Sequence, residues 1–110
     1  MTLQVQLVLR EMLNNPADPR YGLDLCGETG LPSGTIYPIM ARLEAIRWVE
    51  SDWEDPDAHI AAGRPRRRYY KLTREGAECA ADALQAIERS RKSAARAWRV
   101  PMPGTSGAGL

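Results

Sequence analysis

Apolar residues recur every three or four positions over most of this chain, a spacing that predicts amphipathic helices. The first such stretch begins near the N-terminus, where Thr2 is suited to cap a helix. This helix should end before Asn14-Asn15-Pro16, because the residue before a proline is disfavoured in the helical conformation. Its apolar stripe would consist of Leu3, Leu7, Val8 and Met12.

A short second helix is predicted after this break. Asp18 would be its N-cap and Pro19 its first residue, where the missing backbone donor of proline costs nothing. Gly30 would end it, because glycine readily adopts the left-handed conformation that closes many helices. Its apolar side would consist of Tyr21, Leu25 and Cys26.

The third predicted helix has the most regular pattern in the chain. Its apolar stripe consists of Ile36, Ile39, Met40, Leu43 and Ile46. Its opposite face is built from the small or uncharged residues Gly34, Pro38, Ala41 and Ala45. Helix, short turn and helix is the helix-turn-helix pattern, and this third helix occupies the recognition position.

Pro38 is unusual because proline cannot donate a backbone hydrogen bond. If Thr35 caps the third helix, Pro38 lies at its third position and no bond is lost. If Ser33 caps it, Pro38 lies at about the fifth position and one bond is lost, so the first turn should be irregular.

Alternation of side chains along the chain follows, and it predicts a two-stranded antiparallel hairpin over about 48–53 and 66–72. The residues between the strands, 55–65, are rich in turn formers and predict a long loop. Trp48 and Trp53 should anchor the hairpin to the helices, and Tyr69 and Tyr70 should pack on the core and on the partner strand.

A long final helix is predicted over about 74–99, with Thr73 as its N-cap. Its stripe is close to a heptad repeat and is longer than a small domain can cover, which favours a partner helix. The stripe consists of Ala77, Ala80, Leu84, Ile87, Arg91, Ala94 and Trp98. Residues 100–110 have the composition of a disordered tail.

These elements predict a mainly helical fold with a small β-hairpin, a winged helix-turn-helix followed by a long C-terminal dimerisation helix. We expect a DNA-binding domain over 1–73 and the dimerisation helix over 74–99. With 110 residues, the chain has room for one small domain.

Charge changes this picture, because a net charge of only +1 hides two local concentrations. An acidic run lies between positions 50 and 57, and we expect its residues Asp52, Glu54, Asp55 and Asp57 to form a solvated turn. Basic residues follow without an acid between them, and such a patch can attract a phosphate backbone. The basic run consists of Arg64, Arg66, Arg67, Arg68, Lys71 and Arg74.

The small outer face of the third helix predicts close approach to a DNA major groove, because no long side chain would hold the groove away. Groove contacts would come from Ser33, Gly34, Thr35, Tyr37, Pro38 and Arg42. Arg64, Arg66, Arg67 and Arg68 would contact phosphates from the wing, although alternation directs Arg67 away from Arg66 and Arg68. Alternatively, the same surfaces bind another protein.

Other chemistry has little support. Cys26 and Cys79 should be buried or half-buried free thiols in a cytoplasmic protein, with no metal-ligand spacing around them. His59, the only histidine, lies in the predicted loop without a ligand partner. We expect no catalytic set, no metal, no cofactor, no signal peptide and no membrane span.

The chain resembles the PadR-type transcriptional regulators. The resemblance covers about residues 3–98 and rests on three motifs: Tyr21-Gly22-Leu23-Asp24-Leu25, then Gly34-Thr35-Ile36-Tyr37-Pro38 with Arg42-Leu43-Glu44, then Arg68-Tyr69-Tyr70-Lys71-Leu72-Thr73 with Gly76. It implies a homodimeric repressor acting on a pseudo-palindromic double-stranded DNA operator. Arg47 departs from the family pattern, because glycine is usual at this left-handed position after the third helix.

The resemblance also implies that the final helix packs against the first helix of the partner subunit. Dimerisation would then involve Leu3, Leu7, Leu84, Ile87, Arg91, Ala94 and Trp98. Many relatives respond to aromatic small molecules. Trp98 would therefore either fill the dimer interface or line a flat pocket for an aromatic effector.

Overall fold

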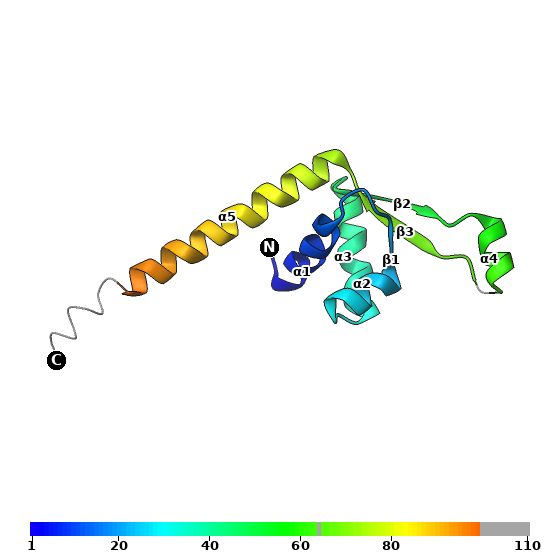
Figure 1. Cartoon of the computed structure of the whole chain (residues 1–110), viewed down its shortest axis with the longest axis horizontal. Helices are drawn as coiled ribbons and strands as arrows, with labels where there is room; N and C mark the ends of the chain where they lie inside the picture. Colours follow the sequence, from blue (N-terminus) through cyan, green and yellow to red (C-terminus); the bar gives the residue numbers. More distant parts are fainter. Residues whose placement is uncertain (64, 100–110) are drawn as a thin grey trace. The chain divides into compact units, whose positions relative to one another are not determined.

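A computed structural model of the chain describes residues 1–63 and 65–99, without the side chains of residues 58, 59 and 99. Within these ranges the predicted fold class is confirmed, with small strands among mainly helical elements (Figure 1). The chain divides into one compact unit over Met1–Ala80 and a second that begins at Ala81. The predicted tail at 100–110 lies outside the described residues.

Helix α1, Leu3–Asn14, begins as its sequence predicts. The Thr2 hydroxyl accepts a hydrogen bond from the Val5 backbone N–H at 3.2 Å, which satisfies one of the unpaired donors of the first turn. Val8 and Met12 from its stripe are buried, whereas Leu3 is 64% exposed.

The predicted start of the second helix is wrong. Asp18 does not cap a helix; it accepts a hydrogen bond from the Asn15 amide at 2.6 Å. Strand β1, Arg20–Tyr21, comes next, and helix α2, Gly22–Thr29, begins only after it. Pairing of β1 with a later strand keeps this backbone extended, and a two-residue strand is too short to show alternation in the sequence. Gly30 ends α2 in the left-handed conformation, as predicted.

Helix α3, Ser33–Ala45, has Pro32 as its N-cap, so both alternatives for its first turn are wrong. Pro38 is the sixth helical residue and lacks the N–H that would bond the Gly34 carbonyl. The stripe from Ile36 to Leu43 is buried as predicted, but Ile46 is 55% exposed because the helix has already ended at Ala45.

The wing is a three-stranded antiparallel sheet in the order β1-β3-β2, rather than the predicted two-stranded hairpin. Strands β2, Val49–Trp53, and β3, Arg68–Leu72, pair with Val49 opposite Leu72 and Trp53 opposite Arg68. Only one acid–base pair results from this register, Glu50 opposite Lys71.

The long loop predicted between these strands contains a helix, α4, Pro56–Ala62 (Figure 1). Asp55 caps it by accepting a hydrogen bond from the Asp57 N–H at 2.9 Å, and Pro56 takes the first helical position. The aspartate–proline signature expected at 18–19 therefore operates at 55–56 instead.

The core lies where α1, α2 and α3 meet the sheet. Its largest fully buried side chains are Leu9, Met12, Leu25, Ile36, Met40, Val8 and Val49. They come from all three helices and from β2, so they fix α3 against the wing. Cys26 and Cys79 are half-buried free thiols, as predicted.

Helix α5, Arg74–Arg99, has the predicted bounds. The Thr73 hydroxyl accepts from the Gly76 N–H and donates to the Arg47 carbonyl, both at 2.8 Å. A Cβ on Gly76 would overlap the Trp48 carbonyl, so glycine is needed where the helix begins.

Beyond Ala80, α5 continues as a single helix. Leu84 and Ile87 are half-buried, Ala94 is exposed, and Trp98 is 75% exposed. Arg91 pairs with Glu88 at 2.9 Å within the helix. Among the described residues, no helix has the length and apolar character needed to cross a bilayer.

Candidate nucleic-acid interface

The outer face of α3 is exposed along its whole length. Gly34, Pro38, Ala41 and Ala45 all lie at the surface. Ser33 and Arg42 beside them are also exposed, while Thr35 is half-buried. The described part of this face therefore presents a narrow ridge of small side chains with one arginine on its flank, a shape that fits a groove of DNA.

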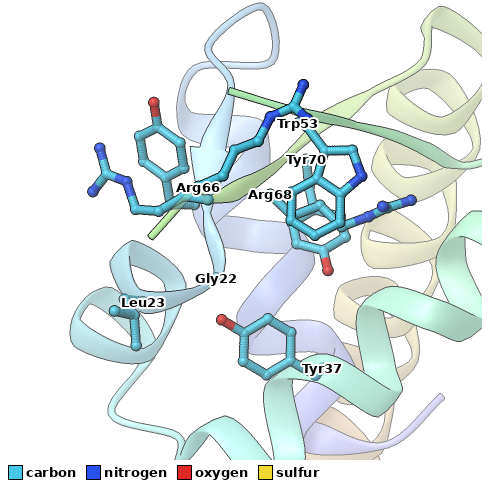
Figure 2. Close-up of a pocket in the computed structure, with 9 residues that line it drawn as sticks. Gly22, Leu23, Tyr37, Trp53, Arg66, Arg68 and Tyr70 are labelled. Atoms are coloured by element: carbon cyan, nitrogen blue, oxygen red, sulfur yellow. The ribbon is translucent and has the colours of Figure 1, made fainter. Parts of the chain in front are cut away.

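Tyr37 does not extend freely from this face. Its ring lies against Gly22 at the start of α2, where an added Cβ would come within 2.5 Å of the ring. The side chain remains 42% exposed, with its hydroxyl end close to Gly22 (Figure 2). Glycine in the Tyr21-Gly22 motif thus makes room for the tyrosine of the Tyr37-Pro38 motif.

Two wing arginines flank Trp53. The Arg66 guanidinium carbon lies 5.8 Å from the Trp53 ring centroid and that of Arg68 lies 5.2 Å from it. Arg66 also donates to the Glu54 carbonyl at 2.9 Å. Arg68 donates to the Ser51 hydroxyl at 2.6 Å and pairs with Glu44 of α3 at 3.6 Å. These contacts hold the wing and α3 together on one side of the domain.

Arg67 points the other way, as the alternation predicted. Its guanidinium stacks 3.7 Å from the centroid of the Tyr21 ring and forms an ion pair with Glu54 at 3.5 Å. Its Nε is buried without a hydrogen-bond partner, which is consistent with stacking on the ring face. Arg67 is thus engaged inside the wing, whereas Arg66 is exposed. Arg64 lies outside the described residues.

The prediction that the acidic run is a solvated turn is wrong for Glu54, which is only 4% exposed. Its carboxylate accepts hydrogen bonds from the Arg67 backbone N–H at 3.2 Å and from the Tyr21 hydroxyl at 3.5 Å. A buried carboxylate requires such partners. Glu54 joins β1 to the end of the hairpin that leads into α4, and only its spacing from Arg67 across the connection could have indicated this.

The prediction that Trp53 anchors the hairpin to the helices is also wrong. Trp53 is 47% exposed rather than buried against a helix, and the guanidinium groups of Arg66 and Arg68 lie beside its ring. Trp48 is half-buried, and its carbonyl accepts from the Thr73 N–H at 3.0 Å. Tyr70 is buried on the core, and Tyr69 packs edge-on against Tyr21 of β1.

A pocket of about 350 Å³ opens between the wing and the start of α2 and α3 (Figure 2). Four aromatic residues line it: Tyr21, Tyr37, Trp53 and Tyr70. The arginines at 66–68 supply its positive charge, and Gly22 and Leu23 complete the wall. The sequence pattern did not reveal this pocket, because its lining residues come from five separate elements, β1, α2, α3, β2 and β3, and from the loop before β3.

Burial raises the pKa of Tyr70 above its ordinary value of 10.0, and the nearby Tyr37 and Glu44 add to this rise while Arg68 opposes it. The Tyr70 hydroxyl therefore stays protonated near neutral pH and can donate a hydrogen bond. Among the described residues, no group of three or more potential ligands is placed to hold a metal ion.

Residues 12–82 match the transcriptional regulator PadR-like family. The chain belongs to this family. PadR-like proteins are DNA-binding regulators of transcription rather than enzymes, so the predicted family and general function are confirmed. No curated protein matches the chain.

Several solved structures, two of them PadR family regulators, share its fold. A PadR family regulator from Eggerthella lenta is 21% identical with a TM-score of 0.69, over 89% of this chain and 87% of that one. One from Clostridium difficile is 22% identical with a TM-score of 0.67, over 84% of this chain and 95% of that one. Bordetella bronchiseptica BpsR, whose DNA binding is regulated by 6-hydroxynicotinic acid, is 17% identical with a TM-score of 0.65, over 84% and 64%.

Proposed function

We propose that this PadR-like protein is a homodimeric repressor that binds a pseudo-palindromic operator through α3. The exposed ridge from Gly34 to Ala45 is the observation that carries the proposal. Its small side chains let the helix backbone approach base edges, and the exposed Arg42 on its flank can form a bidentate contact with guanine.

The wing adds contacts that do not depend on base sequence. Arg66 is exposed beside α3 and is suited to a phosphate contact. Arg68 is more constrained by Ser51 and Glu44, and Arg67 by Tyr21 and Glu54. We therefore rank Arg66 first among the wing residues for contact with phosphates. Arg64, Arg67 and Arg68 are proposed as further phosphate contacts.

A dimer would place two α3 helices in successive major grooves, roughly 34 Å apart. The exposed apolar residues of α1 and α5 support such an assembly, with Leu3 64% and Trp98 75% exposed in the single chain. Leu7, Leu84, Ile87, Arg91 and Ala94 would complete this interface. Sedimentation of the full chain as a dimer, shifted toward monomer by Leu84→Ala, would support it; a monomer at all concentrations would contradict it.

An aromatic small molecule would release the operator. BpsR gives a precedent for control of DNA binding by an aromatic acid. Trp98 would be one contact for such a molecule if paired tryptophans meet in the dimer. The operator-bound form would lower transcription from an adjacent promoter, which in vitro transcription with and without the protein measures.

The test of DNA binding compares two arginine variants over a range of salt concentration. Arg42→Ala should weaken binding to a selected duplex by about 1–3 kcal/mol and relax its base preference. Arg66→Ala should weaken binding to all duplexes alike. It should also reduce the slope of log affinity against log salt concentration by the amount expected for about one phosphate contact.

Arg89→Ala is the matched control, because Arg89 is exposed but lies outside α3, the wing and the basic run. Equal binding by all three variants would contradict the assigned roles. Absence of any salt-dependent binding to duplex DNA would instead favour a winged helix that contacts another protein.

A further inference from the structure

The pocket between the wing and α3 combines two properties that rarely occur together at a surface. Its walls are mainly aromatic, and three arginines line it. None of the described residues that line it is acidic. Its volume of about 350 Å³ lies at the lower end of the range for small-molecule sites.

Trp53 is the exposed aromatic wall of this pocket. Nearly half of its surface is open to solvent, although a tryptophan on a sheet usually packs on the core. Arg66 and Arg68 on either side hold the ring in place and concentrate positive charge around it. A planar ring can stack on Trp53 while an anionic substituent pairs with a guanidinium.

The opposite side of the pocket offers hydroxyl groups. Tyr37 from α3 and Tyr70 from β3 direct their hydroxyls into the space between the wing and the helices (Figure 2). Both can hydrogen-bond a polar group on a bound ring. A simple inorganic anion would leave the aromatic walls exposed to water, so the lining favours a ligand that is both planar and anionic.

We propose that this pocket binds a planar aromatic anion of one or two rings, and that the bound anion competes directly with DNA. Competition follows because Arg66 lines the pocket and is also the wing residue that we rank first for phosphate contact, and because Tyr37 in the pocket wall comes from α3 itself. The ligand neutralises positive charge that a phosphate would otherwise meet. This second step rests on the proposed function, but binding to the pocket does not.

Binding is tested first without DNA, by calorimetric titration of the full chain with 2-naphthoate and with its uncharged analogue 2-naphthylmethanol. Naphthoate should bind about tenfold more tightly than the alcohol, because only the carboxylate pairs with arginine. Trp53→Ala should weaken naphthoate binding by about tenfold, and Tyr37→Ala should also weaken it.

Ile60→Ala is the control, since Ile60 is 69% exposed on α4 and does not line the pocket. Circular dichroism checks that each variant is folded. Three results would overturn the site. Naphthoate could fail to bind, or it could bind Trp53→Ala as tightly as the parent. Binding could also be lost in Trp98→Ala but kept in Trp53→Ala.

Competition is then measured with labelled duplex DNA. Naphthoate should raise the apparent Kd for DNA in the parent protein and have about tenfold less effect on Trp53→Ala. Unchanged DNA affinity in naphthoate-saturated protein would overturn the competition. DNA binding without naphthoate binding would refute the pocket alone, whereas naphthoate binding without DNA binding would refute the proposed function alone.

Discussion

The ring of Tyr37 on α3 occupies the space that a side chain at Gly22 on α2 would fill. An ideal Cβ on Gly22 would lie 2.5 Å from both Cε1 and the hydroxyl oxygen of Tyr37. The motif that contains Gly22 and the motif that contains Tyr37 are separated in sequence but pack directly against each other. This contact sets the position of Tyr37 between the proposed DNA surface and the adjacent pocket.

Gly22→Ala should lose stability through this contact alone. Gly27→Ala, in the same helix, would meet no atom within 4 Å and should gain about 0.5–1 kcal/mol from its better helix propensity. The free energy of unfolding of Gly22→Ala should be about 1–2 kcal/mol lower than that of Gly27→Ala, because the Tyr37 ring must move. Urea denaturation measures both.

A double-mutant cycle isolates the contact. In a Tyr37→Ala background the ring is gone, so Gly22→Ala and Gly27→Ala should have similar effects on the free energy of unfolding. The same gap between them in both backgrounds would show that Tyr37 is not the cause.

Arg47 adopts a left-handed conformation with φ of 63°, at the position where the family usually has glycine. Arg47→Gly should therefore be more stable than Arg47→Ala by about 1 kcal/mol, since both remove the charge but only glycine removes the strain. Thermal denaturation of the two variants compares them. An alanine variant as stable as the glycine variant would mean that the position carries no strain.

Glu54→Gln should destabilise the wing. The buried carboxylate faces the Arg67 guanidinium and accepts from the Tyr21 hydroxyl, and an amide cannot replace its charge. We expect a loss of about 1–3 kcal/mol in the free energy of unfolding. Glu50→Gln, an exposed change on β2, the strand that ends just before Glu54, should stay within about 0.5 kcal/mol. Equal losses would contradict the structural role of Glu54.

The raised pKa of Tyr70 leads us to expect a lower free energy of unfolding at alkaline pH. Its pKa is raised on folding, so the protonated form stabilises the folded state fully below the ordinary value of 10.0. This stability is lost as the pH rises from that value through the folded pKa. Tyr70→Phe cannot ionise here, so its stability relative to the parent should improve between about pH 7 and pH 11. A constant difference over that range would contradict this.

Helical periodicity predicted the fold well, because long amphipathic stripes are strong local signals. The bounds of α5 and the left-handed end at Gly30 followed from capping rules, whereas the left-handed position of Arg47 followed from the resemblance to the family. Strand β1 did not, since its pairing with β3 is a long-range contact that two residues cannot encode locally.

The candidate site was less predictable for the same reason. Exposure of the α3 ridge followed from its spacing, but the inward turn of Arg67 depends on Tyr21 and the buried Glu54. Sequence composition marked all the arginines alike. Alternation set Arg67 apart, but only three-dimensional partners separate the exposed Arg66 from the half-buried Arg68.

The central claim is that the small ridge of α3 enters the groove of DNA, and Ala41→Leu tests it most directly. Leucine keeps the charge and helix propensity but adds bulk at an exposed position. The measurement is an anisotropy titration with a duplex selected by the parent protein, with Ala17→Leu as the control at an exposed site outside α3. We predict an affinity about tenfold or more below the parent for Ala41→Leu and unchanged for Ala17→Leu. Equal affinity of Ala41→Leu and the parent would contradict the claim.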